Sequence, residues 1–589
     1  VPAGASGPRG VVLEDDLTTW DLWWDHNKNA FLDLRGADRQ AVQTGSDDFY
    51  LGATRRALAV DTVRPDAAMV TQVILPALRR AIDRTDQRDI QSSCLMAMAK
   101  IGRNHPDFTL REVFAPRLRN ADQEVRETAA LALGVAGIAD PATLELMIDL
   151  VLDRGRGREA SAGDVDERVR SFAAYGLGLL ADAGVVHAVR REIFTALQQA
   201  LASDDLGRNL EVAAIHAIGL CARGGAGYQG ARLRDDAIET LAQHFDRRAG
   251  PGRQWMLAHC PTVIARLAGR DHARSRVLVQ RYTAILDGSE DRPTPVQQSC
   301  ALALGQLARP GDDERADDAD REAVKALREA SASHRDAQTR YFSLLALGQI
   351  GGADNRTFLL QTFDRARKTQ EKPWCGIALG LLARAANAHG ADGEISARLR
   401  QEYENAKEPG LTGALAVALG LSRALDAAPV LRRRLLDDEH QEDVAGYACI
   451  GLSLMKDRSA LAQLRSVVGR STRRPVLLTQ ATTALGNMGD QRIAEDLHEM
   501  LDGEVNLARF AAVAGALSRI GDRRSVDRLI TALFDDERPT LARAFAAVAL
   551  GGIADRRDHP WNTPIAVDSN YRAAVETFTD RQAGVLDIL

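Results

Sequence analysis

Two short segments place a histidine beside a group that could take part in chemistry. His259 and Cys260 stand together after a Trp-Met pair, and an imidazole beside a thiol is used in nucleophilic catalysis and in metal binding. The surrounding residues are Ala-rich and apolar, which favours a buried histidine whose hydrogen bonds are satisfied within the fold. His498 and Glu499 lack the second histidine of an HExxH zinc motif. This second pair is predicted to be an exposed part of a helix.

The charged clusters of the chain favour solvated surfaces over binding sites. Residues 437–443 read Asp-Asp-Glu-His-Gln-Glu-Asp and could hold a cation, but they lack the glycine and the spacing of a calcium loop. The Arg-rich stretches at 432–434 and 470–474 could contact phosphate, but they are typical of exposed helix faces. None of these clusters predicts a site.

The sequence holds none of the compact motifs that bind nucleotides or activate a nucleophile. There is no GxxxxGK[ST] loop, no GxGxxG turn, no GxSxG elbow and no paired CxxC. No catalytic residue, cofactor or metal ion is predicted, and the protein is predicted not to be an enzyme. Isolated cysteines in apolar helical stretches predict small buried thiols rather than disulfides. They are Cys94, Cys221, Cys260, Cys300, Cys375 and Cys449.

The length and charge of the chain set further limits. Its 589 residues exceed what one hydrophobic core usually serves, which indicates several domains or a repeat array. With 75 basic and 81 acidic residues the net charge is −6, which argues against a nucleic-acid partner. No apolar run approaches the roughly 20 residues that cross a bilayer, so no membrane span is predicted.

An Ala-rich helical phrase that ends in Leu-Gly, or in a similar small residue, recurs along the chain. Its copies follow at an average spacing of about 38 residues, within the range of helical repeats. A second amphipathic run precedes each phrase, as in residues 526–534. The pattern predicts an all-α fold, a right-handed superhelix of about 13 helix pairs around one continuous core. The small residues that end the phrases are Ala99, Gly134, Gly178, Gly219, Ala265, Gly305, Gly348, Gly380, Gly420, Gly451, Gly486, Ser518 and Gly551.

A small residue at this place is expected where two helices cross closely, because Gly and Ala allow the shorter interaxial distances. Replacing Gly348 or Gly486 by Leu is therefore predicted to destabilise the fold by roughly 1–3 kcal/mol through overpacking.

The phrase at residues 122–134, Asp-Gln-Glu-Val-Arg-Glu-Thr-Ala-Ala-Leu-Ala-Leu-Gly, resembles the second helix of the HEAT-repeat family, in particular its short bacterial form. The resemblance implies that the arginine eight residues before the glycine is structural and pairs with an acidic residue between units. Other units depart from the pattern, since Glu211, Gln297 and Phe510 occupy that place. The arginines that match are Arg126, Arg170, Arg340 and Arg543.

Both ends of the chain depart from the repeat. Trp20, Trp23 and Trp24 lie in a helix that is predicted to cap the first unit, with an aromatic docking site as the alternative. The segment that follows the array, with Trp561, is predicted to pack back as a second cap or to bind a partner. The predicted division is a flexible leader (1–16), a Trp-rich helical cap (17–69), the HEAT-repeat array (70–556) and a C-terminal cap and tail (557–589).

The resemblance is specific for the fold and says little about function. We expect a non-catalytic scaffold that binds a protein or peptide partner on its concave face, with four inserted loops between residues 155 and 321 at the rim. The alternative is a lyase or chaperone that acts on a tetrapyrrole, because some short bacterial HEAT proteins attach bilins. A HEAT-type DNA glycosylase is disfavoured by the net charge.

The Trp-rich start also resembles exported bacterial HEAT proteins, so the location is predicted to be either outside the cell after removal of a signal or the cytoplasm.

Overall fold

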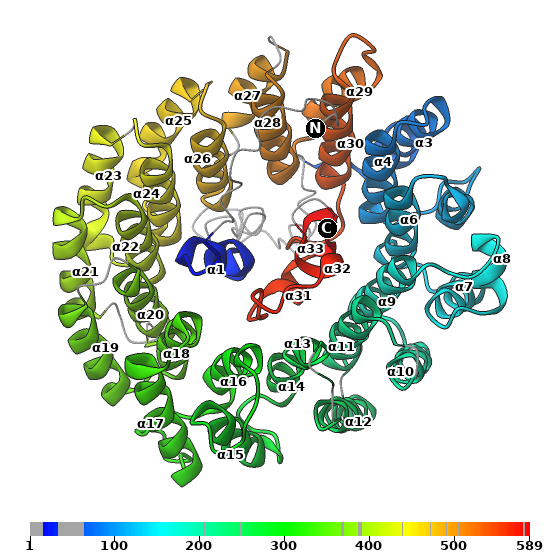
Figure 1. Cartoon of the computed structure of the whole chain (residues 1–589). Helices are drawn as coiled ribbons and strands as arrows, with labels where there is room; N and C mark the ends of the chain where they lie inside the picture. Colours follow the sequence, from blue (N-terminus) through cyan, green and yellow to red (C-terminus); the bar gives the residue numbers. More distant parts are fainter. Residues whose placement is uncertain are drawn as a thin grey trace, which may run out of the picture.

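The computed structural model describes residues 16–32 and 64–589, apart from short gaps at 204–205, 226, 248–249, 251, 367–369, 387–391, 439, 472, 491, 503–505 and 581–582. The predicted leader (1–16) lies almost wholly outside this range. Within it the chain forms helices and no β-strand. Thirteen helix pairs follow one another (Figure 1), which confirms the all-α array of helix pairs.

The first helix of each pair lies on the outside of the array and the second on the inside (Figure 1). The outer helices are α3 (Leu75–Arg84), α5 (Leu110–Phe114), α7 (Pro141–Val151), α10 (His187–Leu201), α12 (Gly227–Phe245), α15 (Ser275–Leu286), α17 (Asp318–Ser333), α19 (Ala353–Arg365), α21 (Gly393–Asn405), α23 (Ala428–Asp437), α25 (Leu461–Arg470), α27 (Ile493–Asp502) and α29 (Val526–Phe534). The inner helices are α4 (Arg88–Ile101), α6 (Gln123–Val135), α9 (Glu167–Asp182), α11 (Arg208–Arg223), α14 (His259–Ala268), α16 (Thr294–Leu307), α18 (Ala337–Ile350), α20 (Glu371–Ala386), α22 (Pro409–Leu421), α24 (Glu442–Met455), α26 (Pro475–Asn487), α28 (Leu507–Ile520) and α30 (Thr540–Ile553).

Shorter helices supplement the pairs. A five-residue π-helix (Val70–Ile74) joins α2 (Ala67–Met69) to α3. Helix α8 (Gly155–Ser161) lies in the insertion that begins at residue 155, and α13 (Gln254–Leu257) precedes α14. All thirteen small residues that end the recurring phrase lie in the inner helices.

Aspartates define where several inner helices begin. The Asp122 carboxylate accepts hydrogen bonds from the main-chain N–H groups of Glu124 and Val125 at 2.9 and 3.4 Å, at the start of α6. Asp336 accepts from Thr339 at 2.7 Å, at the start of α18. The first N–H groups of a helix have no partner within it, so an N-cap carboxylate stabilises the first turn.

Most of the phrase glycines lie where two inner helices approach backbone to backbone. A Cβ atom added to Gly348 would lie 2.4 Å from the carbonyl oxygen of Ala378, and one on Gly134 would lie 2.1 Å from that of Gly176. Gly486 differs, because an added Cβ would meet no atom within 4 Å. The expectation that Gly486 also lies at a close crossing is therefore wrong.

The two glycines provide a matched pair of substitutions. We expect Gly348→Ala to lower the free energy of unfolding by roughly 1–3 kcal/mol, because the Cβ must displace the backbone of α20. Gly486→Ala should leave the stability unchanged or raise it by up to about 1 kcal/mol, because alanine is the better helix former. Urea unfolding of both variants measures the difference. Equal stability of the two would contradict the close packing of α18 on α20.

The arginines of the phrase bind within their own unit. The expected acidic partner in a neighbouring unit is replaced by main-chain carbonyl groups, which are left free where the outer helix ends. Arg543 adds an ion pair of 2.9 Å with Asp536 of the same unit. The guanidinium groups donate to carbonyl oxygens as follows: Arg126 to Asn120 and Ala121, Arg170 to Val151, Arg340 to His334 and Arg335, and Arg543 to Leu533.

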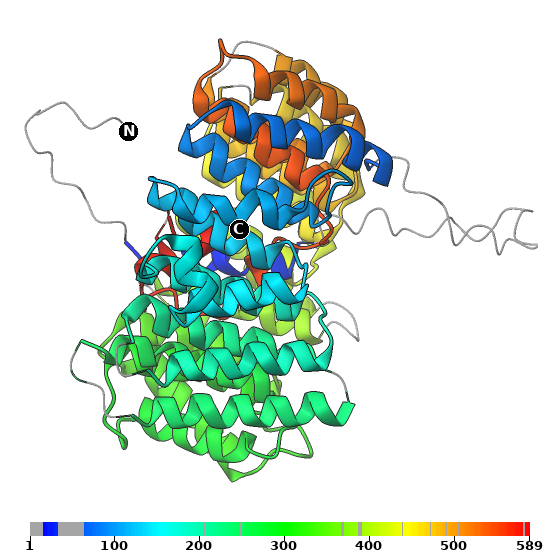
Figure 2. The ribbon, with the colours of Figure 1, turned by 90° about the vertical axis from the view of Figure 1, so that its right-hand side faces the viewer.

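The array closes on itself. Inner helix α30 of the last pair packs against inner helix α4 of the first (Figure 1). A Cβ atom on Gly551 would lie 2.5 Å from the Cα atom of Ala97, so this contact is as close as those between successive units. Next to this helix contact, Arg84 forms an ion pair of 3.0 Å with Asp536 and packs over the ring of Phe534. The thirteen pairs form a closed ring, which Figure 2 shows from the side.

The Trp-rich helix lies inside this ring. Helix α1 (Trp20–Asn27) contacts α22 and α31 (Thr563–Ala566), and the ring centroid of Trp20 is 4.8 Å from that of Tyr447 on α24. Trp20, Trp23 and Trp24 are only 4%, 2% and 1% exposed. The helix therefore does not cap the first unit, which packs on the last one. Its tryptophans bind within their own chain and offer no docking surface.

The residues that follow the array also turn into the ring. This C-terminal segment (residues 556–589) contains α31, α32 (Glu576–Thr579) and α33 (Val585–Ile588), and Figure 1 shows it across the centre. Trp561 is fully buried, donates from Nε1 to the Asp555 carboxylate at 3.1 Å and lies 4.0 Å from the Arg557 guanidinium. The segment covers the inner face rather than the open end of an array.

Candidate functional site

Polar side chains of the inner helices hold the main chain of the C-terminal segment. Because they bind carbonyl and amide groups, these contacts depend little on which side chains the segment carries. Asn209 of α11 accepts from the N–H of Thr577 at 3.2 Å. The donors to carbonyl oxygens are Lys100 of α4 to Leu589 at 2.6 Å, Arg168 of α9 to Ala583 at 3.3 Å, His259 of α14 to Ala573 at 2.9 Å, and Arg266 of α14 to Pro564 and Val567 at 3.0 and 3.2 Å.

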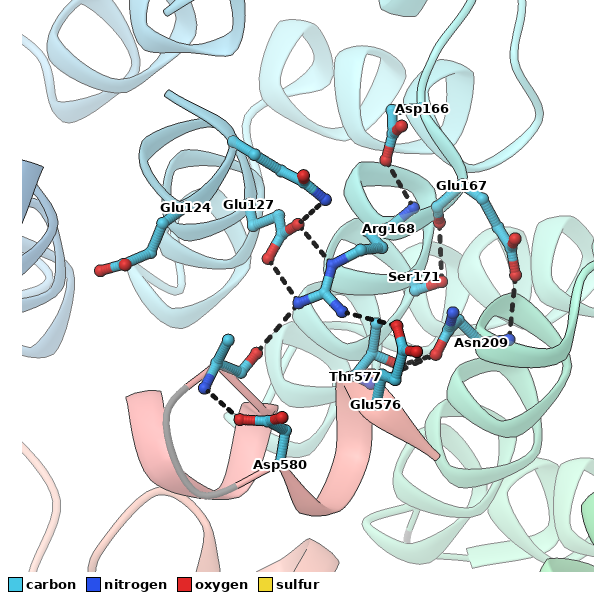
Figure 3. A network of polar contacts seen from close by, with 12 residues as sticks. Glu124, Glu127, Asp166, Glu167, Arg168, Ser171, Asn209, Glu576, Thr577 and Asp580 are labelled. Atoms are coloured by element: carbon cyan, nitrogen blue, oxygen red, sulfur yellow. Dashed lines mark hydrogen bonds and ion pairs between the residues drawn. The ribbon is translucent and has the colours of Figure 1, made fainter. Parts of the chain in front are cut away.

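Arg168 is positioned by a buried carboxylate (Figure 3). Its guanidinium donates to both oxygens of Glu127 on α6, at 2.6 and 3.0 Å, and Glu127 is almost fully buried. The bidentate bond raises the pKa of Arg168 and fixes the plane of the guanidinium. From this position Arg168 also reaches Glu576 of the segment at 3.4 Å. The two inner helices thus present one oriented cation to the segment.

One aromatic side chain of the segment is inserted between inner helices. Phe578 stacks on the His216 ring with 4.5 Å between centroids, and the His259 ring lies nearly perpendicular to it with 5.3 Å between centroids. The ring centroid of Tyr175 on α9 lies 6.4 Å from that of Phe578. Phe578 is fully buried, so its contacts contribute roughly 3–5 kcal/mol by the usual cost of truncating a buried phenylalanine.

The two histidines around Phe578 form a chain of hydrogen bonds. His216 Nε2 lies 3.0 Å from His259 Nδ1, and His259 Nε2 lies 2.9 Å from the Ala573 carbonyl oxygen. The carbonyl can only accept, so His259 carries its proton on Nε2 and His216 donates to it. Burial, together with the charge of Arg266, lowers the pKa of His259 to about 4. Burial, His259 and Arg266 hold the pKa of His216 well below its usual value. Both histidines are therefore neutral at pH 7.

A second buried polar group joins the segment to the ring nearby. Burial lowers the pKa of Arg266 to about 10 and raises that of Asp568, and each charge favours the other. Gln349 of α18 donates to the Asp568 carboxylate at 2.9 Å. Asn27 of α1 accepts from the Asp568 N–H at 2.9 Å, so α1 and the C-terminal segment are held together as well.

The residues that the sequence singled out lie as follows. His259 belongs to this site, where it binds the segment, whereas Cys260 is a buried thiol whose pKa is raised by burial. His498 is buried and bonded to Ser525 at 2.7 Å, so the prediction of an exposed pair with Glu499 is wrong. Lys100, Arg168 and Asn209 were not foreseen, since each is a single polar residue on an otherwise ordinary helix.

Two absences hold for the part of the chain that the structure describes. No helix there is long and apolar enough to cross a membrane. Among those same residues no group of three or more His, Cys, Asp or Glu side chains could hold a metal ion.

Comparison with known proteins identifies one repeat. Residues 511–535, which include most of α28 and all of α29, match the PBS lyase HEAT-like repeat. A comparison with curated proteins gives no match.

The solved structures that are similar to this chain share little sequence identity with it. The karyopherin Kap121p, bound to the extreme C-terminus of the protein phosphatase Cdc14p, is 11% identical with a TM-score of 0.39, over 88% of this chain and 61% of the karyopherin. In its complex with the SUMO protease Ulp1p the karyopherin is 12% identical, with a TM-score of 0.40, over 90% of this chain and 62% of the karyopherin. An engineered protein is 16% identical, with a TM-score of 0.22 over 81% of this chain and 98% of its own. This chain spans less than two thirds of the karyopherin.

The repeat match and the thirteen consecutive helix pairs agree with each other. The chain is a ring of thirteen helix pairs closed around helix α1 and the C-terminal segment, and residues 511–535 of this ring match a HEAT-like repeat.

Proposed function

We propose that this protein is a non-catalytic scaffold whose inner face binds an extended segment of a partner protein, in the place that its own C-terminal segment occupies. One observation carries the proposal. Side chains on α4, α9, α11 and α14 bind the main chain of the C-terminal segment at points from Pro564 to Leu589. A surface that pairs with main-chain groups accepts many sequences.

Two further features support an exchangeable segment. The segment has little regular structure, since α31, α32 and α33 contain four residues each. Its anchoring depends on a few aromatic side chains, among them Phe578 and Tyr571, whose ring lies 4.9 Å from that of His26. A partner with an aromatic residue at a matching distance could make the same contacts.

The test loosens one anchor and then offers the segment as a peptide. We expect a fluorescent peptide of residues 569–589 to bind the Phe578→Ala variant, measured by fluorescence anisotropy. The wild type should bind it far more weakly, because its tethered segment competes at an effective concentration on the order of millimolar. Glu576→Gln is the control, since it removes only the 3.4 Å ion pair with Arg168 and keeps the anchor.

A partner protein captured from a native extract should compete with the C-terminal segment for the same inner face. We expect the Phe578→Ala protein to retain more of it than the wild type, and the free peptide to release it. A partner that both proteins retain equally, and that the peptide does not release, would assign binding to the outer helices and refute the proposal.

A further inference from the structure

A basic cavity lies at the edge of the inner face, beside the start of the C-terminal segment. It encloses about 620 Å³ between the end of the Trp-rich segment and the C-terminal ends of α20, α22 and α24. Arg384, Arg423 and Lys456 line it from three successive units, and Phe31, Leu454 and Asp558 are also part of its wall.

Arg384, Arg423 and Lys456 outnumber the one carboxylate of the wall, Asp558, and two of the three cations have no ion-pair partner among the described residues. Neither Arg384 nor Arg423 forms an ion pair within the described ranges. Arg384 lies over the ring of Phe31 at 5.2 Å. Burial lowers the pKa of Arg384, and the positive charge of Arg423 lowers it further. Arginines are otherwise commonly paired in this chain, so two neighbouring unpaired guanidinium groups in one cavity call for a counter-charge.

The backbone at two of the cations is strained. Arg423 has φ +53° and Lys456 has φ +58°, both directly after an inner helix. The N–H of Arg423 donates to Gly420 and that of Ala424 to Leu419, which is the helix ending that favours glycine. After α4 and α28 the chain does use glycine, at Gly102 and Gly521. Two residues with strained backbones in the wall of one cavity indicate a functional role for their side chains.

We infer that this cavity binds a small organic anion, a phosphate or carboxylate group on an apolar body, with Arg384 and Arg423 as its ligands. The two guanidinium groups supply planar donors that match either group. Phe31 and Leu454 supply an apolar wall for the rest of the molecule. A volume of this size suits a small-molecule ligand.

The experiment titrates the full-length protein with phenyl phosphate at low ionic strength, by calorimetry and by the shift in melting temperature. We expect Arg423→Gly to weaken binding at least tenfold, and to leave the melting temperature of the free protein unchanged or higher. Arg384→Met, which keeps an apolar stem over Phe31, should also weaken binding at least tenfold. Ala162→Gly is the matched control, because Ala162 ends α8 with φ +58° and lies outside the cavity. It should bind phenyl phosphate as the wild type does.

A second titration replaces phenyl phosphate by benzoate, and the tighter of the two identifies the group that the cavity prefers. If the two arginines only stabilise the helix ends, the opposite pattern is expected. Arg423→Gly would then lower the melting temperature, and phenyl phosphate would bind every variant as it binds the wild type. That pattern, or no binding of either anion by the wild type, would overturn the inference.

Discussion

Replacing Gly551 by leucine should open the ring. An added Cβ would already lie 2.5 Å from the Cα atom of Ala97, so a leucine forces α30 away from α4. We expect a loss of about 3 kcal/mol or more, at the upper end of overpacking. Because each pair of a repeat array is stabilised mainly by its neighbours, the other pairs should remain folded. Small-angle scattering should show a larger radius of gyration with nearly unchanged helix content by circular dichroism.

Gly515→Leu is the control for this change. Gly515 lies in α28, the inner helix before α30, and an added Cβ would meet only the Arg519 guanidinium at 3.6 Å. This variant should keep the shape of the wild type. If Gly551→Leu also keeps the wild-type radius of gyration and stability, α30 and α4 do not pack as described.

Acid should release the C-terminal segment before the ring unfolds. The pKa of His259 is about 4 in the folded protein, below the usual 6.5 for an exposed histidine. The unfolded state therefore takes up a proton before the folded state does, and stability is lost as the pH falls from about 6.5 to about 4. The loss is about 3 kcal/mol for His259, since a tenfold change in proton affinity is worth about 1.4 kcal/mol. His216 adds to it in the same direction.

Hydrogen exchange of the segment between pH 7 and pH 4 measures this release. We expect protection of residues 573–580 to fall with pH in the wild type. It should change much less in His259→Gln, whose amide N–H group can still donate to the Ala573 carbonyl. His440→Gln, which alters an exposed histidine between α23 and α24, should follow the wild type. A profile that is the same in all three proteins would show that other groups govern the acid response.

The inner helices could be predicted from sequence because every unit repeats the same local signals. An N-cap such as Asp122, an Ala-rich run and a small residue such as Gly134 are sufficient to place a helix and its crossing. The same phrase misled at Gly486, where the neighbouring helix does not approach. The spacing of residues along one helix carries no information about the distance from that helix to the next inner helix.

Closure of the ring could not be predicted, because the contact that closes it uses the same chemistry as every internal contact. Ala97 and Gly551 are ordinary small residues of an inner helix, and nothing nearby marks them as partners. The site on the inner face was missed for a related reason. The sequence places His259 beside Cys260, yet His259 binds the carbonyl of Ala573, 314 residues further along the chain.

The distance between the two ends of the array tests the closed ring most directly. Cysteines introduced for Asp86, after α3, and for Thr531, on α29, would carry spin labels at exposed positions, while the six native cysteines are buried. In a closed ring these helices are neighbours, so electron–electron double resonance should give one narrow distance below about 35 Å, given interaxial distances of about 10 Å and the length of the label arms. An open arc of thirteen units at this spacing would place them on the order of 100 Å apart. If the protein that carries only these two cysteine substitutions gives a distance beyond the range of the measurement, the ring is not closed.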